Sequence, residues 1–169
     1  IRKPHNAIWD INHVGPWDAA IKGSSALRQA LLGAFFDELH VLTGEMVTTL
    51  LWDMEKFYDH ISIPKLINRA LELEYPIHIL ALGIQMHVAP RALKAYDTYT
   101  VVANIFNGII AGCTQSNIFA RMLLYPIMHR SYYGAPYLYI NSFVDDIRQS
   151  MADEDPHTLA ESIVSAGEG

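Results

Sequence analysis

The sequence predicts an α+β fold in which an antiparallel sheet is backed by helices. Apolar residues make up 51% of the 169 positions, which is enough for one domain with a real core. The predicted elements follow the order helix, strand, two helices, hairpin, helix, hairpin and helix. This order differs from the regular strand–helix repeat of a parallel sheet and is typical of an antiparallel sheet with helices on one face.

The first elements are a helix and a buried strand. Leucine and phenylalanine residues recur at helical spacing over residues 24–42, with Ser24 and Ser25 as N-cap candidates and Gly44 as a C-cap. Residues 1–23 are punctuated by prolines and glycines and are expected to be irregular. The β-branched, apolar run 47–52 predicts a buried strand that leads directly into an aspartate.

Two helices and a short hairpin are expected in the middle of the chain. Pro64 suits the first turn of a helix that runs from residue 62 to about 75, and Pro76 opens another that runs to about 88. Arg91–Tyr96 and Tyr99–Ile105 flank Asp97-Thr98, which predicts a hairpin with its turn at that dipeptide.

The last third of the chain is expected to contain a helix, a second hairpin and a final helix. A glycine-rich loop over residues 108–113 leads into a helix over 114–133, for which Thr114 and Ser116 are the N-cap candidates. A strand over 137–144, a tight turn and a partner strand to about 151 follow. Asp155-Pro156 then starts the final helix.

Composition excludes several classes of protein. The single cysteine, Cys113, rules out a disulfide framework and a cysteine zinc site. No apolar run reaches the roughly 18–20 residues of a membrane span. The net charge of −6 is unfavourable for binding nucleic acid unless metal ions or missing segments offset it. The chain starts without methionine or a targeting signal, so a fragment is expected, and nuclear and cytoplasmic locations both stay open.

Three blocks carry the chemistry. The first, Leu50–Ile61, contains Asp53 at the end of the predicted strand and Tyr58 five residues later. The second is the glycine loop and helix start over 108–116. The third is Phe143-Val144-Asp145-Asp146, whose adjacent carboxylates repel each other and cost desolvation unless a cation sits beside them. A strand–turn–strand with these acids at its tip presents both to one site.

In order and chemistry these blocks resemble motifs A, B and C of the reverse transcriptase palm. The form of the first block, with Lys56 and Asp59 around the aromatic residue, is closest to enzymes of non-LTR retrotransposons and group II introns. The resemblance covers roughly residues 17–150. It implies a partial fingers segment over 1–46 and a truncated palm over 47–169, without a thumb and without most of the fingers.

The resemblance also implies which residues perform catalysis. Asp53, Asp145 and Asp146 are the expected catalytic and metal-binding residues; the first two bridge the ions, and Asp146 is auxiliary. Phosphoryl transfer to a primer 3′-hydroxyl uses two divalent ions about 4 Å apart. Hard Mg²⁺ prefers carboxylates and keeps several waters and substrate phosphates. Two Mg²⁺ ions, or Mn²⁺ in their place, are therefore the expected cofactors.

The substrates follow from the same resemblance. Tyr58 matches the position that stacks under the incoming sugar, where a ring fills the space of a 2′-hydroxyl and favours dNTPs. Gly112, Cys113, Lys22 and Phe143 are the other expected substrate-binding residues. The implied activity is RNA-directed DNA synthesis, with an RNA template, a DNA primer and dNTPs as partners, and without a membrane.

Two alternatives stay open. Phe143 stands where the family usually has tyrosine, Ala111 where it has glutamine, and Cys113 where serine is common. These departures and the acidic charge allow a reverse-transcriptase-like domain that has lost catalysis and serves in binding or structure. The other alternative is the palm of an RNA-dependent RNA polymerase, which usually has aspartate at the spacing of Tyr58.

Overall fold

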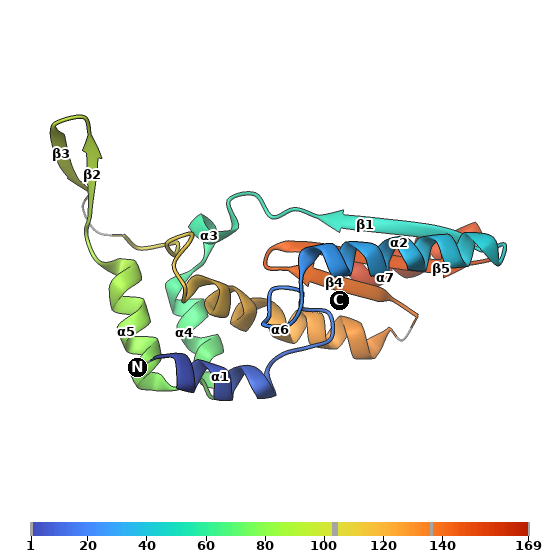
Figure 1. Ribbon diagram of the computed structural model, residues 1–169, viewed down its shortest axis with the longest axis horizontal. Helices are drawn as coiled ribbons and strands as arrows, with labels where there is room; N and C mark the ends of the chain where they lie inside the picture. Colours follow the sequence, from blue (N-terminus) through green and yellow to red (C-terminus); the bar gives the residue numbers. More distant parts are fainter. Residues whose placement is uncertain (1, 103–104, 136, 169) are drawn as a thin grey trace. The chain divides into compact units, whose positions relative to one another are not determined.

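The computed structural model describes residues 2–102, 105–135 and 137–168 (Figure 1). It confirms the predicted α+β fold with antiparallel sheets. The chain divides into two compact units. The helical unit contains residues 1–12 and 55–123, and the sheet unit contains residues 13–54 and 124–169. The expected division into fingers and palm is not tested by this partition and stays a prediction.

Three strands form the sheet of the sheet unit. They are β1 (Met46–Trp52), β4 (Tyr139–Phe143) and β5 (Asp146–Asp153), in the order β1-β5-β4. Both pairings are antiparallel, so β5 joins its hairpin partner β4 to the sequence-distant β1. The bounds agree with the predicted strands to within two residues. The prediction that the run 47–52 is a buried strand is wrong, because no residue of β1 is buried and Leu51 is 77% exposed.

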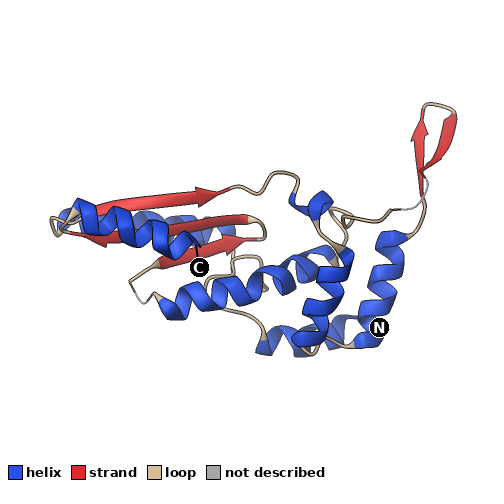
Figure 2. Cartoon of the chain, turned by 180° about the vertical axis from the view of Figure 1, so that it is seen from behind, coloured by secondary structure: helices blue, strands red, loops and turns tan. Residues whose placement is uncertain are grey.

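Helices cover both faces of this sheet, so the expectation of helices on one face is wrong. The helix α2 (Ala26–Leu42) lies over one face, and α7 (Pro156–Glu168) lies against β1 and β5 on the other, as Figures 1 and 2 show from opposite sides. Asp155 caps α7, because its carboxylate accepts from the backbone N–H groups of His157 and Thr158. The apolar core of the unit contains Trp17, Met128, Leu138 and Ile140.

The helix α2 differs from the amphipathic helix that its sequence predicts. Ser25 is the N-cap, as expected, since its hydroxyl accepts from the Arg28 N–H at 3.1 Å. The leucines and phenylalanine that revealed the periodicity are mostly exposed: Leu27, Leu31, Phe35 and Leu39. The helix instead meets the sheet through the buried Gly33 and the half-buried Phe36 and Asp37.

The helical unit consists of short helices around one apolar core. Its helices are α1 (Arg2–Asn12), α3 (Phe57–His60), α4 (Ile63–Glu72), α5 (Ile77–Val88) and the first part of α6 (Ser116–Gly134). Between α5 and α6 the chain forms a hairpin of β2 (Arg91–Ala95) and β3 (Thr98–Val102). The most deeply buried side chains of this core are Leu66, Ile79, Ile109, Phe119 and Met122.

Two predictions about the amino-terminal half are wrong. Residues 2–12 form α1 rather than irregular chain, because a proline at position 4 is tolerated in the first helical turn. The helix is held by Trp9, which is buried and donates its indole N–H to the Leu73 carbonyl at 2.9 Å. The four-residue helix α3 was not expected, since so short an element has no periodicity to detect.

Two turn and cap predictions are also wrong. The β2–β3 turn falls at Tyr96-Asp97, one residue earlier than expected, with Tyr96 at a φ of 53°. Residues 103–104 of the predicted second strand lie outside the described residues. The helix α6 starts at Ser116, whose hydroxyl donates to the Ile110 carbonyl at 2.6 Å instead of accepting a helical N–H, and Thr114 lies in the preceding turn.

Candidate active site

Two of the predicted acids meet at one end of the three-stranded sheet. Asp53 directly follows β1, and Asp146 is the first residue of β5. Trp52 pairs with Ile147, so the register continued by one residue places Asp53 opposite Asp146. Opposite residues of an antiparallel pair share one face of the sheet. Both acids line a pocket of about 500 Å³, to which Phe143 also contributes.

The hairpin turn between β4 and β5 carries backbone strain. Phe143 pairs with Asp146, which leaves Val144 and Asp145 as the two turn residues. Val144 has a φ of 60°, a conformation that a β-branched residue rarely adopts and that costs of order 1–3 kcal/mol. Such strain clusters at functional sites. The turn holds the half-buried Asp145 at the tip of the hairpin.

The carboxylates of Asp53 and Asp146 fit a hard divalent cation, although they do not surround a metal ion completely. Within residues 2–102, 105–135 and 137–168, no three His, Cys, Asp or Glu side chains lie close enough together to hold a metal ion. Mg²⁺ keeps several waters and is usually bound through one or two carboxylates plus substrate phosphates. The exposed carboxylates of Asp53 and Asp146 in a shared pocket meet that requirement. The assignment of ion-bridging roles stays a prediction.

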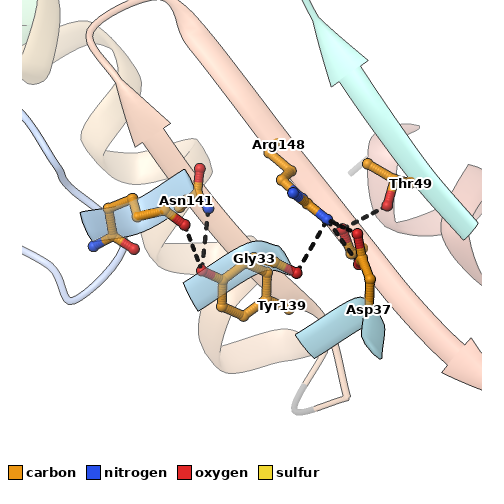
Figure 3. A network of polar contacts seen from close by, with 8 residues as sticks. Gly33, Asp37, Thr49, Tyr139, Asn141 and Arg148 are labelled. Carbon is orange, nitrogen blue, oxygen red and sulfur yellow. Dashed lines mark hydrogen bonds and ion pairs between the residues drawn. The ribbon is translucent and has the colours of Figure 1, made fainter. Parts of the chain in front are cut away.

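Arg148, which was not predicted as a site residue, lines the same pocket. Figure 3 shows its contacts with Asp37 and Gly33. Arg148 Nη2 donates to both carboxylate oxygens of Asp37, at 2.7 and 2.6 Å, and to the Gly33 carbonyl at 3.4 Å. Its Nε donates to Ser150 Oγ at 2.9 Å. The sequence could have indicated Arg148, because residues two apart on a strand share a face and Arg148 lies two residues after Asp146. The network places a positive charge beside the acids.

The glycine block lies in the helical unit and packs against α3. The N–H groups of Gly108 and Ile109 donate to the carbonyls of Ile61 and Tyr58, each at 2.8 Å. Gly108 has a φ of 83°, and a Cβ there would lie 2.9 Å from the Asp59 carbonyl oxygen. The close approach that this glycine permits is therefore to the backbone of the same chain.

The residues at the other end of the loop are more open. Gly112 has a φ of 79°, is exposed, and has no atom within 4 Å of an added Cβ. Cys113 is a half-buried free thiol, and its Sγ accepts from the Gln115 N–H at 3.4 Å. Both are expected substrate-binding residues, and those roles stay predictions.

One residue of the loop is clamped on both sides of its backbone. The Ile110 N–H donates to His87 Nδ1 at 2.9 Å, and the Ile110 carbonyl accepts from Ser116 Oγ at 2.6 Å. Burial of His87, followed by the charges of Arg91 and Arg2, lowers the pKa of its imidazole. The acceptor role at Nδ1 requires the neutral tautomer with its proton on Nε2. The sequence offered no signal for this clamp.

A buried polar chain supports the start of α6. Gln115 donates through Nε2 to the Tyr75 hydroxyl, and that hydroxyl donates to Asn6 Oδ1 at 2.7 Å. Burial raises the pKa of Tyr75 to about 12, so the phenol remains a donor at neutral pH.

The remaining expected substrate contacts lie in both units. Tyr58 is half-buried in α3 of the helical unit, and its hydroxyl donates to Asn117 Oδ1 at 3.1 Å. Lys22 is exposed in the sheet unit and lines a pocket other than that of the acids. Phe143 lines the acid pocket with 44% of its surface exposed. The role of Tyr58 as a sugar gate stays a prediction. None of the described helices is long and apolar enough to cross a membrane.

Comparisons with known proteins bear on the fold. No protein-family model matches the chain, and no curated protein matches it. Two solved structures of telomerase, a reverse-transcriptase-related polymerase, are similar. Apo telomerase from Candida tropicalis, truncated from the C-terminal domain, has a TM-score of 0.67 at 13% identity and aligns with 99% of this chain. Telomerase from Candida albicans, in complex with a fragment of telomeric RNA, has a TM-score of 0.69 at 14% identity over the same share.

The similarity covers this chain almost completely but only part of its neighbours. The chain spans 36% of the Candida tropicalis protein and 32% of the Candida albicans protein. At such low identity the likeness concerns the fold alone. The chain has a reverse-transcriptase-like fold.

Proposed function

We propose that this chain is part of an RNA-directed DNA polymerase, which transfers a nucleotide from a dNTP to a primer 3′-hydroxyl. The observation that carries the proposal is the meeting of Asp53 and Asp146 in one pocket at the end of β1 and β5. The reverse-transcriptase-like fold supports it, because the resemblance to the reverse transcriptase palm assigns Asp53 and Asp146 to metal binding.

The chain's own residues would act by binding and orientation. Asp53 and Asp146 supply exposed carboxylate oxygens to the pocket, and Asp145 lies in the turn at the hairpin tip. Bound Mg²⁺ would lower the pKa of the primer hydroxyl and neutralise the triphosphate. In the reaction the hydroxyl would lose its proton to solvent and its oxygen would bond to the α-phosphorus. The bond from the α-phosphorus to the bridging oxygen would break, and pyrophosphate would leave. Arg148, paired with Asp37, supplies a fixed guanidinium to the pocket wall.

The finer placement rests on the sequence. The spacing of Asp53, Lys56 and Tyr58 is the ground for inferring an enzyme of the non-LTR retrotransposon or group II intron kind. The same tyrosine is the ground for preferring dNTPs over rNTPs. An RNA template and a DNA primer follow from the proposed activity. The likeness to telomerases is one of fold and does not bear on these choices.

Primer extension tests the activity. The chain, alone and within any longer polypeptide that contains it, is given an RNA template, a DNA primer, dNTPs and Mg²⁺. We expect Asp145→Ala to abolish extension, whereas Lys65→Ala, an exposed substitution in α4, leaves it unchanged. Extension that survives in Asp145→Ala would refute the mechanism. We expect Tyr58→Ala to admit rNTPs, and unchanged sugar selectivity would refute the gate.

A second measurement separates the proposal from a domain that has lost catalysis. Titration calorimetry with Mg²⁺ and dNTP is performed on the wild type and on Asp53→Asn. Joint binding that the substitution weakens supports the polymerase. Absence of binding at millimolar ion favours the alternative of a binding or structural domain, for which Ala111 and Phe143 are the motivating departures. Equal or preferred use of rNTPs by the wild type would favour an RNA polymerase.

A further inference from the structure

A second pocket of the sheet unit is larger than the acid pocket and has a different chemistry. Its volume is about 790 Å³, within the usual range for ligand sites. It is lined by the segment before α2, the first turns of α2, the end of α6 and the start of β4. Gln29 lines both pockets, so they lie on either side of the first turns of α2.

Two cations at this pocket have no partner among the residues that the structure describes. Lys22 and Arg28 both line it and are exposed. In the described part of the chain, neither side chain forms an ion pair or a hydrogen bond, whereas Arg148 and Arg121 are each paired with an aspartate. The carboxylate of Asp18 also lines the pocket but accepts from the Ala20 N–H at 2.8 Å. Uncommitted charge of this kind suits a phosphate, particularly at a guanidinium.

Aromatic rings form the other wall. Tyr139 stacks on Phe36 with 5.1 Å between ring centroids, and Tyr132 packs on Trp17 at 5.2 Å, so these rings are held in place. Tyr137 and Tyr133 are 79% and 64% exposed. Clustered exposed rings of this kind are a feature of ligand-binding grooves, and their faces can stack on a flat ligand.

We propose that this pocket binds a nucleoside phosphate, with the base against the tyrosines and the phosphate at Arg28 and Lys22. Stacking on aromatic faces together with cations that contact the backbone is the recognition mode for unpaired nucleotides. The same chemistry is present in a free nucleotide and in a nucleotide of a single strand. The site uses none of the predicted catalytic acids and requires no metal ion.

Direct binding in EDTA tests the proposal independently of the polymerase activity. Chemical shifts of the ¹⁵N-labelled chain are followed during titration with AMP, adenosine, inorganic phosphate and the oligonucleotide (rA)₆. We expect AMP and (rA)₆ to shift residues 22–36 and 137–140, and adenosine or phosphate alone to bind more weakly. Arg28→Ala and Tyr137→Ala should each weaken AMP binding about five-fold or more. Lys65→Ala and Tyr99→Ala are exposed controls outside the pocket.

The outcomes separate the sources of the ligand. Binding of (rA)₆ at least ten times tighter than that of AMP identifies a strand, and equal binding identifies a free nucleotide. The proposal is overturned if neither probe binds at ~10 mM, if Arg28→Ala and Tyr137→Ala bind like the wild type, or if phosphate binds as tightly as AMP. Asp53→Asn should leave AMP binding unchanged. Refutation of the polymerase activity and refutation of nucleotide binding at this pocket therefore give different results.

Discussion

The close approach of Gly33 and Arg148 predicts that Gly33→Ala destabilises the wild type but stabilises a chain in which Arg148 is replaced by alanine. Gly33 lies inside α2, where alanine is ordinarily about 1 kcal/mol more favourable than glycine. A Cβ at this position would lie 2.6 Å from Arg148 Nη1 and 2.9 Å from Cζ. The guanidinium must therefore move if Gly33 becomes alanine.

The magnitude follows from the bonds that the movement breaks. Displacement of the guanidinium costs its ion pair with Asp37, worth about 1 kcal/mol because both side chains are partly exposed. It also costs the bond to Ser150, worth about 0.5–1.5 kcal/mol. After the helical gain of about 1 kcal/mol, Gly33→Ala should destabilise the chain by about 1 kcal/mol. In an Arg148→Ala background the clash is absent, and the same change should stabilise by about 1 kcal/mol.

Thermal unfolding of the four variants of this cycle measures the effect by circular dichroism. For a chain of this length, 1 kcal/mol corresponds to about 2–4 °C in Tm. We expect Gly33→Ala to lower Tm by that amount in the wild type and to raise it by the same amount in Arg148→Ala. A rise of Tm in both backgrounds would refute the inference that the glycine exists to admit the arginine.

Three further predictions concern the glycine loop. Because the pKa of His87 is lowered in the folded chain, the unfolded chain binds the proton more readily, so the contribution of neutral His87 to stability is present above about pH 6.5 and is lost as the pH falls through the folded pKa. The free energy of urea unfolding should show this loss in the wild type and in the control His60→Gln, and less of it in His87→Gln. The same dependence of that free energy on pH in His87→Gln would contradict the assignment. The same substitution should speed hydrogen exchange at the Ile110 amide, and unaltered exchange would exclude the clamp. Gly108→Ala should lower Tm, because it combines a φ of 83° with a clash, whereas Gly134→Ala meets nothing within 4 Å and should not; equal effects would contradict the local argument.

Much of the candidate site could be predicted because its signals are local. The apolar runs on either side of Asp145-Asp146 predicted a hairpin, and both strands are present. Strand β1 was predicted in the same way, with Asp53 directly after it. The glycine-rich loop over residues 108–113 was predicted as well, and its Gly108 and Gly112 have positive φ. Short-range sterics and side-chain periodicity decide such features, so the sequence alone carries them.

Other features depend on partners far apart in the chain. The Arg148–Asp37 pair joins residues separated by 111 positions, and the His87–Ile110 bond has no motif that announces it. The α1 helix is held by the bond from Trp9 to the Leu73 carbonyl, 64 positions away, which no local pattern indicates. In each case long-range packing selects among local conformations of similar energy.

By itself the sequence determined the strand ends, the turn and the acids that they carry, because each depends on neighbouring residues. Only the tertiary structure decided that Asp53 and Asp146, rather than Asp145, share a pocket, since the β1–β5 register sets which residues lie opposite each other. It alone also brought Lys22 and Arg28 to a pocket of tyrosines, because the chain before α2 packs beside the start of β4.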